Sequence, residues 1–381
     1  MKIFHLTHTD INTDSRILKQ IKSLSFEKSF SIYGLGIKLN DSSVKDFLNR
    51  DNVKLESIDL YSKKISFLSR QFRHPFVFFE LMINVLLKTR NSEIDIIHCH
   101  DTLVLPIGYL LKKIKKSKLI YDAHELESKK NGQTNFMSWG TLFIEKKCWK
   151  SVDLLISVSE SILGWYEKNL GNKKKVLILN SPEISDSDKS INKPKLYKKK
   201  YFHNFYGIPH QTIIFLYLGF FTSGRGIEKI INAFNSDKIS SHVVFVGFGD
   251  MKDIILLASK NNNKIHYHKA VKHDDVVDIS RNADVGLCLI ENISLSDYYC
   301  LPNKLFEYAF SGLPVLASDF PELNNVISKF ELGFCCENKS SAIEKAIKKI
   351  ENNPVAEINS NLSELSWEAQ GKKLISAYRM I

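Results

Sequence analysis

The chain has 381 residues, of which 44% are hydrophobic and 25% charged, and its formal net charge is +11. This balance excludes a disordered chain, and the length predicts two domains of roughly 150–200 residues each. The positive charge has two interpretations, a solvated lysine-rich surface or attraction to an anionic membrane face or a diphosphate-linked acceptor. We expect no nucleic acid partner, because the sequence contains no recognised nucleic-acid-binding module.

The six cysteines show no spacing typical of a zinc site or a disulfide framework. The chain begins directly with an apolar strand pattern, so we expect no signal peptide. Its longest apolar run, residues 75–87, contains Glu80 and is too short to cross a bilayer. These features together predict a cytoplasmic protein.

Short apolar runs alternate with helical patterns along the whole chain, which predicts an α/β protein with parallel sheets. In the first half we expect strands at residues 2–7, 30–35, 53–60, 95–99, 118–122, 154–158 and 176–179. In the second half we expect strands at residues 213–218, 242–246, 265–268, 285–289, 314–317 and 333–335. Two successive doubly wound halves predict two Rossmann-like domains, with function at the carboxyl ends of their strands.

The domain boundary is expected within residues 181–200, which are rich in Ser, Asp, Lys and Pro and lack a clear apolar period. We therefore assign residues 1–183 to a first domain and residues 184–362 to a second. Residues 363–381 carry apolar side chains at helical spacing around Trp367, which predicts a terminal helix.

The first predicted strand is followed by a polar loop and then by a helix. Asp14 or Ser15 is expected to cap that helix. Arg16 follows directly and is a candidate for contact with an acceptor phosphate.

Two further strands of the first domain end in polar residues, where such sheets place function. One contains His98 and ends in His100 and Asp101, and the other ends in Asp122-Ala123-His124. His98 is expected to pack within its strand. For His100 and Asp101, capping of the helix after Thr102 and contact with an acceptor are equally good interpretations.

Residues 61–90 combine basic and aromatic side chains. One interpretation places this segment on a membrane interface, as with cationic amphipathic segments. The other packs its apolar half on the core and leaves its basic half in solvent.

In the second domain, a glycine-rich loop with Gly219, Gly224 and Gly226 joins a strand to a helix. Glycines let the backbone approach a ligand, and the helix N-terminus faces the same point. Arg225 has the side chain best shaped to bind a diphosphate with two hydrogen bonds. A plain strand–turn–helix connection is the alternative, and the Gly247-Phe248-Gly249 turn is a weaker signal of the same kind.

The most informative segment is Leu301-Pro302-Asn303-Lys304-Leu305-Phe306-Glu307-Tyr308. Pro302 is expected in the first turn of a helix, where its missing N–H costs nothing. The free amides of residues 303–305, with Lys304 beside them, would then form an anion site. Glu307 lies one turn further on, where it can accept hydrogen bonds from sugar or ribose hydroxyls. This combination is what a nucleotide-sugar site requires.

This segment and the Ser311-Gly312-Leu313-Pro314-Val315 run after it resemble the donor-binding element of retaining GT-B glycosyltransferases of group 1, family 4. The similarity is to the branch with a Pro-Asn-Lys-Leu-Phe-Glu motif. It implies two Rossmann-like domains that face each other across a cleft and a C-terminal helix that crosses back to the first domain.

The same resemblance implies roles for individual residues. His124 matches the family histidine that contacts the donor sugar, and Arg225, Lys304 and Glu307 match the residues that hold the diphosphate and the donor hydroxyls. The expected donor-binding set also includes Gly219, Gly224, Gly226, Gly247, Gly249, Tyr299, Asn303 and Leu305, and the acceptor-side set is Arg16, His100 and Asp101.

The chain departs from the family pattern at two donor-site positions. Phe220 stands where members usually carry an Arg, and Tyr299 stands where the wider family has the first of two glutamates. Asp297 or Glu291 could substitute for that glutamate, or both could be solvated loop acids.

The resemblance predicts a retaining hexosyltransferase that uses a UDP- or GDP-sugar and a lipid-linked glycan acceptor, in bacterial surface polysaccharide (O-antigen or capsule type) synthesis. It would act in the cytoplasm, with peripheral association at the inner face of the cell membrane. No metal and no cofactor are expected, because no Asp-x-Asp or His-cluster ligand set is visible in the sequence. The alternatives are a nucleotide-sugar epimerase and a non-catalytic pseudo-transferase.

Overall fold

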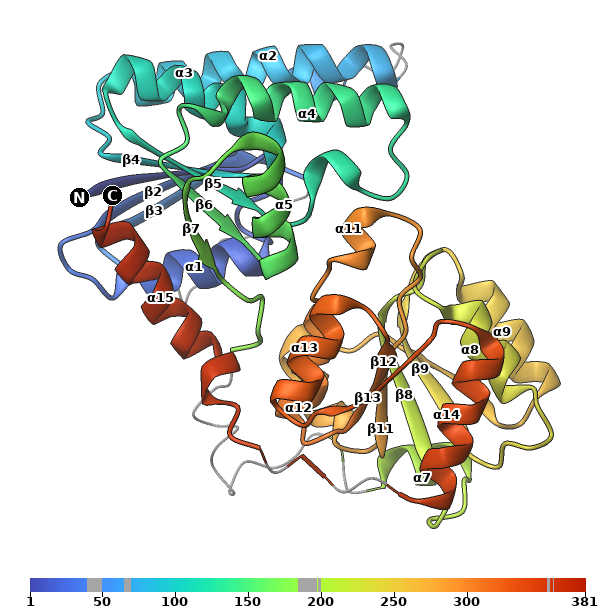
Figure 1. Ribbon diagram of the computed structural model, residues 1–381. Helices are drawn as coiled ribbons and strands as arrows, with labels where there is room; N and C mark the ends of the chain where they lie inside the picture. Colours follow the sequence, from blue (N-terminus) through green and yellow to red (C-terminus); the bar gives the residue numbers. More distant parts are fainter. Residues whose placement is uncertain (40–49, 65–69, 184–196, 198–199, 355–356, 359) are drawn as a thin grey trace. The chain divides into compact units, whose positions relative to one another are not determined.

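The computed structural model describes residues 1–39, 50–64, 70–183, 197, 200–354, 357–358 and 360–381. The chain divides into two compact units (Figure 1). Unit 1 comprises Met1–Leu179 and Glu368–Ile381, and unit 2 comprises Asn180–Trp367. Each unit contains one sheet whose paired strands are all parallel, so the predicted fold class of two parallel α/β sheets is confirmed.

Unit 1 has a seven-stranded sheet in the order β3-β2-β1-β4-β5-β6-β7. The strands are β1 (Lys2–Leu6), β2 (Ser31–Ile37), β3 (Val53–Ile58), β4 (Ile96–His100), β5 (Lys118–Ala123), β6 (Leu154–Ser157) and β7 (Lys174–Leu177). The helices are α1 (Ser15–Ser25), α2 (Arg70–Thr89), α3 (Leu105–Lys115), α4 (Asn135–Trp149), α5 (Glu160–Leu170) and α15 (Trp367–Arg379), with short 3-10 turns η2 (Tyr61–Lys64), η3 (Thr102–Val104) and η4 (Glu127–Lys129). The strand order changes direction at β1 and β4, and ligands of doubly wound sheets bind at such a point.

Helix α1 begins where the sequence predicts. The Asp14 carboxylate accepts hydrogen bonds from the amides of Arg16 and Ile17, which satisfies two otherwise unpaired N–H groups. Ile17, Ile21 and other apolar residues of one helix face are buried against the sheet.

The C-terminal helix α15 packs on unit 1. Its Tyr378 is fully buried, and the hydroxyl forms a short hydrogen bond with Nδ1 of His98 on β4. Oε1 of Gln370 also accepts a 3.2 Å hydrogen bond from the amide of Leu179. The last residues of the chain therefore complete the core formed by the first.

Unit 2 has a six-stranded sheet in the order β10-β9-β8-β11-β12-β13. The strands are β8 (Ile214–Phe220), β9 (His242–Phe248), β10 (Ile265–Lys269), β11 (Val285–Cys288), β12 (Val315–Ser318) and β13 (Gly333–Cys336). The helices are α7 (Tyr201–Tyr206), α8 (Ile227–Phe234), α9 (Lys252–Asn261), α10 (Val276–Ser280), α11 (Leu295–Tyr298), α12 (Asn303–Phe310), α13 (Pro321–Lys329) and α14 (Ser340–Asn352), with η5 (His273–Asp275) and η6 (Ser363–Leu365).

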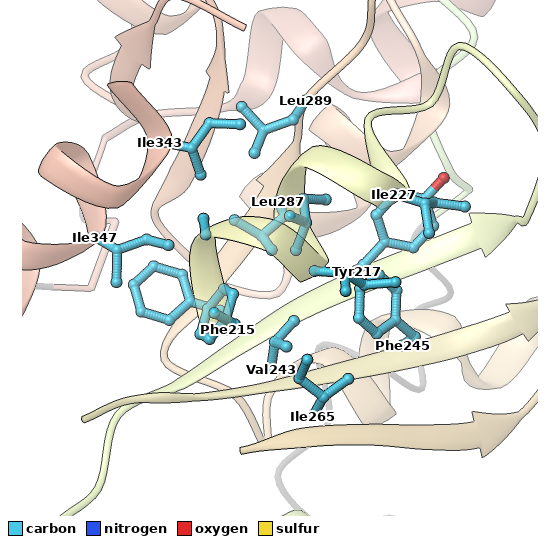
Figure 2. Packing of buried hydrophobic residues seen from close by; sticks show 14 of the residues in the cluster. Phe215, Tyr217, Ile227, Val243, Phe245, Ile265, Leu287, Leu289, Ile343 and Ile347 are labelled. Carbon is cyan, nitrogen blue, oxygen red and sulfur yellow. The ribbon is translucent and has the colours of Figure 1, made fainter. Parts of the chain in front are cut away.

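A hydrophobic cluster fills the space between the unit 2 sheet and helices α8 and α14 (Figure 2). Phe215 and Tyr217 of β8 pack there against Ile227 of α8 and Ile347 of α14. The hydroxyl of Tyr217 donates a 3.2 Å hydrogen bond to the carbonyl of Phe220. The carboxyl end of β8 is therefore held by side chains that the core already fixes.

Every predicted strand is present, with ends that differ by at most two residues from the expected ones. One local prediction was wrong. Pro302 is not in the first turn of α12 but at its N-cap, with an extended backbone (φ −75°, ψ 148°), and the helix begins at Asn303. The fixed φ of proline suits both positions, so the sequence alone did not separate them.

Gly286 of β11 gives a test of how α12 is held. A Cβ at this position would lie 2.4 Å from the ring of Tyr308. That ring cannot move easily, because its hydroxyl donates to the carbonyl of Leu216 and accepts from the amide of Leu218. We expect Gly286→Ala to lower the free energy of unfolding by about 1–3 kcal/mol, measured by thermal unfolding.

Gly140→Ala is the matched control, because nothing lies within 4 Å of a Cβ at that position in α4. It should leave stability unchanged or raise it by up to about 1 kcal/mol. Equal stability of the two variants would contradict the tight contact between β11 and Tyr308.

Candidate active site

Asp122 is the centre of a polar network at the carboxyl ends of β1, β4 and β5 in unit 1. Its carboxylate is fully buried, and it accepts hydrogen bonds from Nη2 of Arg16 (3.0 Å) and Nε2 of Gln20 (2.7 Å). Burial alone would raise the pKa of Asp122, but the nearby Arg16, His124 and His100 hold it well below its usual range. Asp122 is therefore a permanent buried negative charge.

His124 follows β5 and lies between two carboxylates. Its Nε2 is 3.4 Å from Oδ2 of Asp122, and its Nδ1 is 3.6 Å from Oδ1 of Asp101. Burial lowers the pKa of His124, but the two carboxylates outweigh it and raise the pKa to about 9. The side chain retains 18% exposure. His124 is thus a cation at neutral pH that can still reach a ligand.

Three further histidines continue the network into the interior. Nε2 of His100 contacts Nδ1 of His5 at 3.0 Å, and the rings of His98 and His100 stack 4.2 Å apart. Burial is the largest cause that lowers the pKa of all three, and that of His98 falls to about 3. These imidazoles are neutral, and Tyr378 closes the network through His98.

Two groups in the described part of the chain bring together enough ligand atoms to hold a metal ion, His5-His98-His100 and His100-Asp122-His124. The sequence did not reveal them as a set, because each group combines residues on or directly after two strands, β1 and β4 in the first and β4 and β5 in the second. In the first group, the rings of His98 and His100 are within 19° of parallel, so their in-plane lone pairs do not converge on one point. In the second, His124 carries a proton that a metal would have to displace. The present geometry favours a hydrogen-bonded network.

Asp101 has an unusual backbone, with φ 69° and ψ 165°, which costs energy for a residue other than glycine. It occupies the N-cap position of η3 but makes no capping hydrogen bond, so the capping interpretation was wrong. Its carboxylate instead faces Nδ1 of His124 (3.6 Å) and Nδ1 of His8 (3.9 Å). Its strained backbone aims the carboxylate at the imidazoles.

Arg16 and His100, both predicted on the acceptor side, are buried. Nη1 of Arg16 donates to the carbonyl of Ile178 and Nη2 to Asp122, so two of its guanidinium nitrogens are paired within unit 1. Arg16 contacts Asp122, and His100 contacts His124. Both are buried, so neither side chain is exposed to an acceptor.

In unit 2, Lys304 lies above the carboxyl end of β8. Its Nζ is 3.7 Å from the centroid of the Tyr217 ring, and 3.8 Å from the position that a Cβ would take on Gly219. A cation over an aromatic face is stabilised by the ring quadrupole. The hydrophobic core therefore determines where the amine stands, through Tyr217.

The first turn of α12 supplies the amides near Lys304. The Leu305 amide already donates to the carbonyl of Pro302 (3.1 Å), and the Leu305 side chain is fully buried. The amides of Asn303 and Lys304 remain as the candidates for an anion. Glu307 lies one turn further along α12 and is 7% exposed.

Arg225 is partly exposed, and its Nη1 lies 3.7 Å from Oδ1 of Asp297. Asp297 is held in turn at the start of α11, where its amide donates to Oγ of Ser294 (3.0 Å). Glu291 instead forms a 2.6 Å ion pair with Lys229. Of the two acids considered as substitutes for the missing glutamate, Asp297 is the one placed beside a predicted phosphate ligand.

Backbone packing explains why several positions of the predicted donor loops are glycine. A Cβ on Gly226 (φ 73°) would lie 2.2 Å from the carbonyl oxygen of Leu289, and one on Gly247 would lie 1.9 Å from that of Gly219. Gly249 is equally restricted by the Phe221 backbone, and Gly224 also has positive φ. Close packing of the β8 and β9 ends therefore requires Gly247 and Gly249, and packing of the loop after β8 on the Leu289 backbone requires Gly226, whether or not a ligand binds.

Both departures from the family pattern place aromatic rings near these loops. Phe220 is exposed at the end of β8 and packs edge-to-face with exposed Phe248 of β9, with centroids 5.2 Å apart. Tyr299 follows α11 and its ring lies 5.5 Å from that of Tyr298.

Comparison with known proteins identifies both halves of the chain. Residues 198–367 match the family model described as "Glycosyl transferases group 1", and residues 49–181 match that described as "Glycosyltransferase Family 4". Comparison with curated proteins gave no match.

Several solved structures share the fold over the whole chain. Sucrose-phosphate synthase from Thermosynechococcus elongatus is 14% identical, with a TM-score of 0.73, and covers 100% of this chain and 94% of its own. Anabaena HepE in complex with UDP and glucose is 14% identical, with a TM-score of 0.71 and full coverage of both chains. WaaG, a glycosyltransferase involved in lipopolysaccharide biosynthesis, is 12% identical, with a TM-score of 0.62, and covers 100% of this chain and 96% of its own. At these identities the likeness shows the fold.

The position of His124 between two carboxylates predicts a pH dependence of stability. Its pKa is about 9 in the folded chain against an ordinary 6.5. The stabilisation is therefore complete below about pH 6.5 and is lost as pH rises towards 9. We expect the stability difference between the wild type and His124→Gln to shrink by roughly 2–3 kcal/mol across this interval, measured by denaturant unfolding.

His266→Gln serves as the control. Burial and the neighbouring His242 lower the pKa of His266 to about 4, so this residue is neutral in both states above its ordinary pKa. The stability difference between the wild type and His266→Gln should stay constant as pH rises from about 6.5 to 9. A constant difference for His124→Gln as well would show that His124 is not held as a cation.

Proposed function

We propose that this chain, a glycosyltransferase of the GT-B fold, is a retaining hexosyltransferase that moves a hexosyl group from a UDP- or GDP-sugar to a lipid-linked glycan. The observation that carries the proposal is the position of Lys304, whose amine lies on the Tyr217 ring beside Gly219 at the carboxyl end of β8. A nucleoside diphosphate needs a fixed cation of this kind. The solved structure of Anabaena HepE with UDP and glucose supports a nucleotide-sugar donor.

Unit 2 would bind the donor. Arg225, Lys304 and the amides of Asn303 and Lys304 would hold the diphosphate and stabilise the charge that grows on it as the sugar leaves. Glu307 would accept hydrogen bonds from the ribose or sugar hydroxyls. These cations and amides would supply the charge stabilisation without a bound metal.

His124 would support the transferred sugar, as the resemblance implies. In the retaining mechanism that we propose, the bond between the anomeric carbon and the diphosphate oxygen breaks while the acceptor oxygen attacks on the same face. The leaving phosphate takes the proton of the acceptor hydroxyl, so no protein nucleophile is required. The cationic His124 side chain would hold a hydroxyl or phosphate oxygen near the reacting centre.

The setting that we propose is bacterial surface polysaccharide synthesis of the O-antigen or capsule type, in the cytoplasm and peripherally at the inner face of the cell membrane. The likeness to WaaG, described as involved in lipopolysaccharide biosynthesis, supports this setting. Among the helices described in the structure, none is long and apolar enough to cross a membrane.

A non-catalytic pseudo-transferase is the second candidate, because Phe220 and Tyr299 stand where the wider family carries charged residues. A nucleotide-sugar epimerase would need an accessible pair of acid/base carboxyl groups. Asp101 and Glu127 do form a carboxyl pair, but both are buried, and Lys130 binds Glu127 at 2.8 Å. This pair, in the part of the chain that the structure describes, therefore does not meet the requirement of an epimerase.

A thermal-shift panel with UDP, GDP, dTDP, CMP and their sugar conjugates tests the donor site. We expect one nucleoside diphosphate to raise the melting temperature, and Arg225→Ala and Glu307→Gln to abolish that rise, because they remove the diphosphate and hydroxyl ligands. Arg281→Ala is the matched control, since its side chain is as exposed as that of Arg225 and also faces an aspartate.

Turnover separates the two candidates. Release of the nucleoside diphosphate from the stabilising sugar donor, in the presence of a lipid-linked acceptor, would support the transferase. Donor binding without turnover would support the pseudo-transferase. A folded protein that no nucleotide stabilises would overturn the donor site itself.

A further inference from the structure

Two helices on the surface of unit 1 expose rows of large apolar side chains. In α2 these are Phe76, Phe79, Ile83 and Leu87, and in α4 they are Phe136, Trp139 and Phe143. The α4 rings form a continuous row, with Trp139 centred 6.3 Å from Phe136 and 5.6 Å from Phe143. Rows of this length are unusual on a surface that meets only water.

Both rows point away from the sheet. The buried residues of α2 are Leu81, Val85 and Thr89, and those of α4 are Glu145, Cys148 and Trp149, so at helical spacing the exposed rows lie on the opposite faces. Figure 1 shows α2, α3 and α4 on the same face of the seven-stranded sheet. Helix α3 contacts both of the others and exposes Ile114. The rows therefore belong to one outward surface, which we call the helical face.

The helical face is positively charged. The described side chains of helices α2, α3 and α4 include six lysines and two glutamates. Two of these lysines pair with acids outside the three helices, Lys88 with Glu56 and Lys112 with Asp153, which leaves four. Glu80 is a carboxylate that accepts from the amides of Tyr61 and Ser62, and Glu145 is buried against Tyr121 and Tyr166. The lysines of these helices therefore outnumber their acids. Lys146 and Lys147 are exposed in the last turn of α4, and Nζ of Lys147 lies 5.4 Å from the Phe143 ring centroid.

We propose that the helical face is the surface by which this protein lies on an anionic lipid bilayer. Aromatic and aliphatic side chains would enter the boundary of the acyl chains, and the lysines around them would pair with the lipid head groups. The charge argues against a second copy of the chain, because two such faces would repel each other. The inference rests on the proposed peripheral location and identifies the surface and the lipid charge that it requires.

The helical face bears on the two interpretations of residues 61–90, membrane contact and core packing. Leu81 and Val85 pack in the core while Phe76 and Phe79 remain exposed on the same helix, so α2 is apolar on two sides. The membrane and the core interpretations of this segment are therefore compatible. The α4 row, which the sequence analysis did not single out, adds three exposed aromatic rings to this apolar surface.

Flotation of the full chain with vesicles tests the proposal. We expect binding to mixed phosphatidylcholine and phosphatidylglycerol vesicles, weakened by salt, and at least about tenfold weaker binding to phosphatidylcholine alone. The double variant Trp139→Ser/Phe143→Ser should bind the mixed vesicles at least about tenfold more weakly, because it removes apolar area from the interface. The wild type should also show a blue shift of tryptophan fluorescence on binding that this variant loses.

The double variant Ile254→Ser/Leu257→Ser is the matched control, because these residues are exposed on α9 of unit 2, and Leu257 is as exposed as Trp139 at 61%. It should bind vesicles like the wild type. Absence of binding to the mixed vesicles, equal loss in both double variants, or a dimer in solution that Trp139→Ser/Phe143→Ser dissociates would each overturn the proposal.

The nucleotide-induced thermal shift should be the same in the wild type and in Trp139→Ser/Phe143→Ser. This comparison keeps the two proposals distinguishable. If Trp139→Ser/Phe143→Ser loses vesicle binding but keeps the nucleotide response, the result bears on the helical face alone. If the protein binds vesicles but no nucleotide stabilises it, the helical face is supported and the donor site is overturned.

Discussion

The buried charge of Asp122 is the constraint on which the functional end of unit 1 depends. An unpaired carboxylate in this interior would cost several kcal/mol, so the surrounding chain must supply cations and donors. Arg16 and Gln20 of α1, with His100 of β4 and His124 after β5, do so. Meeting this one requirement positions a helix and two strand ends, and it leaves His124 protonated next to solvent.

The functional end of unit 2 is organised by an opposite principle. Its cations are partly exposed, and each is positioned by one or two neighbours rather than enclosed in a network. Lys304 lies on the Tyr217 ring, and Arg225 faces Asp297 across 3.7 Å. Weak pairs of this kind leave much of each charge available to a ligand, because a surface ion pair contributes little by itself. A cluster of fixed but unsaturated cations is what a diphosphate site requires.

The strands and the glycine-rich loops could be predicted from the sequence because both depend on local patterns. Buried parallel strands need short apolar runs, and the tight ends of β8 and β9 need glycine at positions such as Gly247 and Gly249. The network around Asp122 could not be predicted. It joins α1, β1, β4, β5 and the last turns of the chain, and no local pattern relates His5 to Tyr378.

Burial explains why the polar strand ends of unit 1 were harder to interpret than the donor motif of unit 2. In sequence, His100, Asp101 and His124 each end or follow a strand, and Arg16 opens the helix after the first strand. Only the family resemblance sets His124 apart from the others. The structure separates them by what each already contacts. Arg16 and His100 are buried and contact Asp122 within the fold, whereas His124 keeps an exposed edge. A charged residue at a strand end is therefore a strong functional candidate only when the protein's own charges do not satisfy it fully, and in this network His124 meets that condition best.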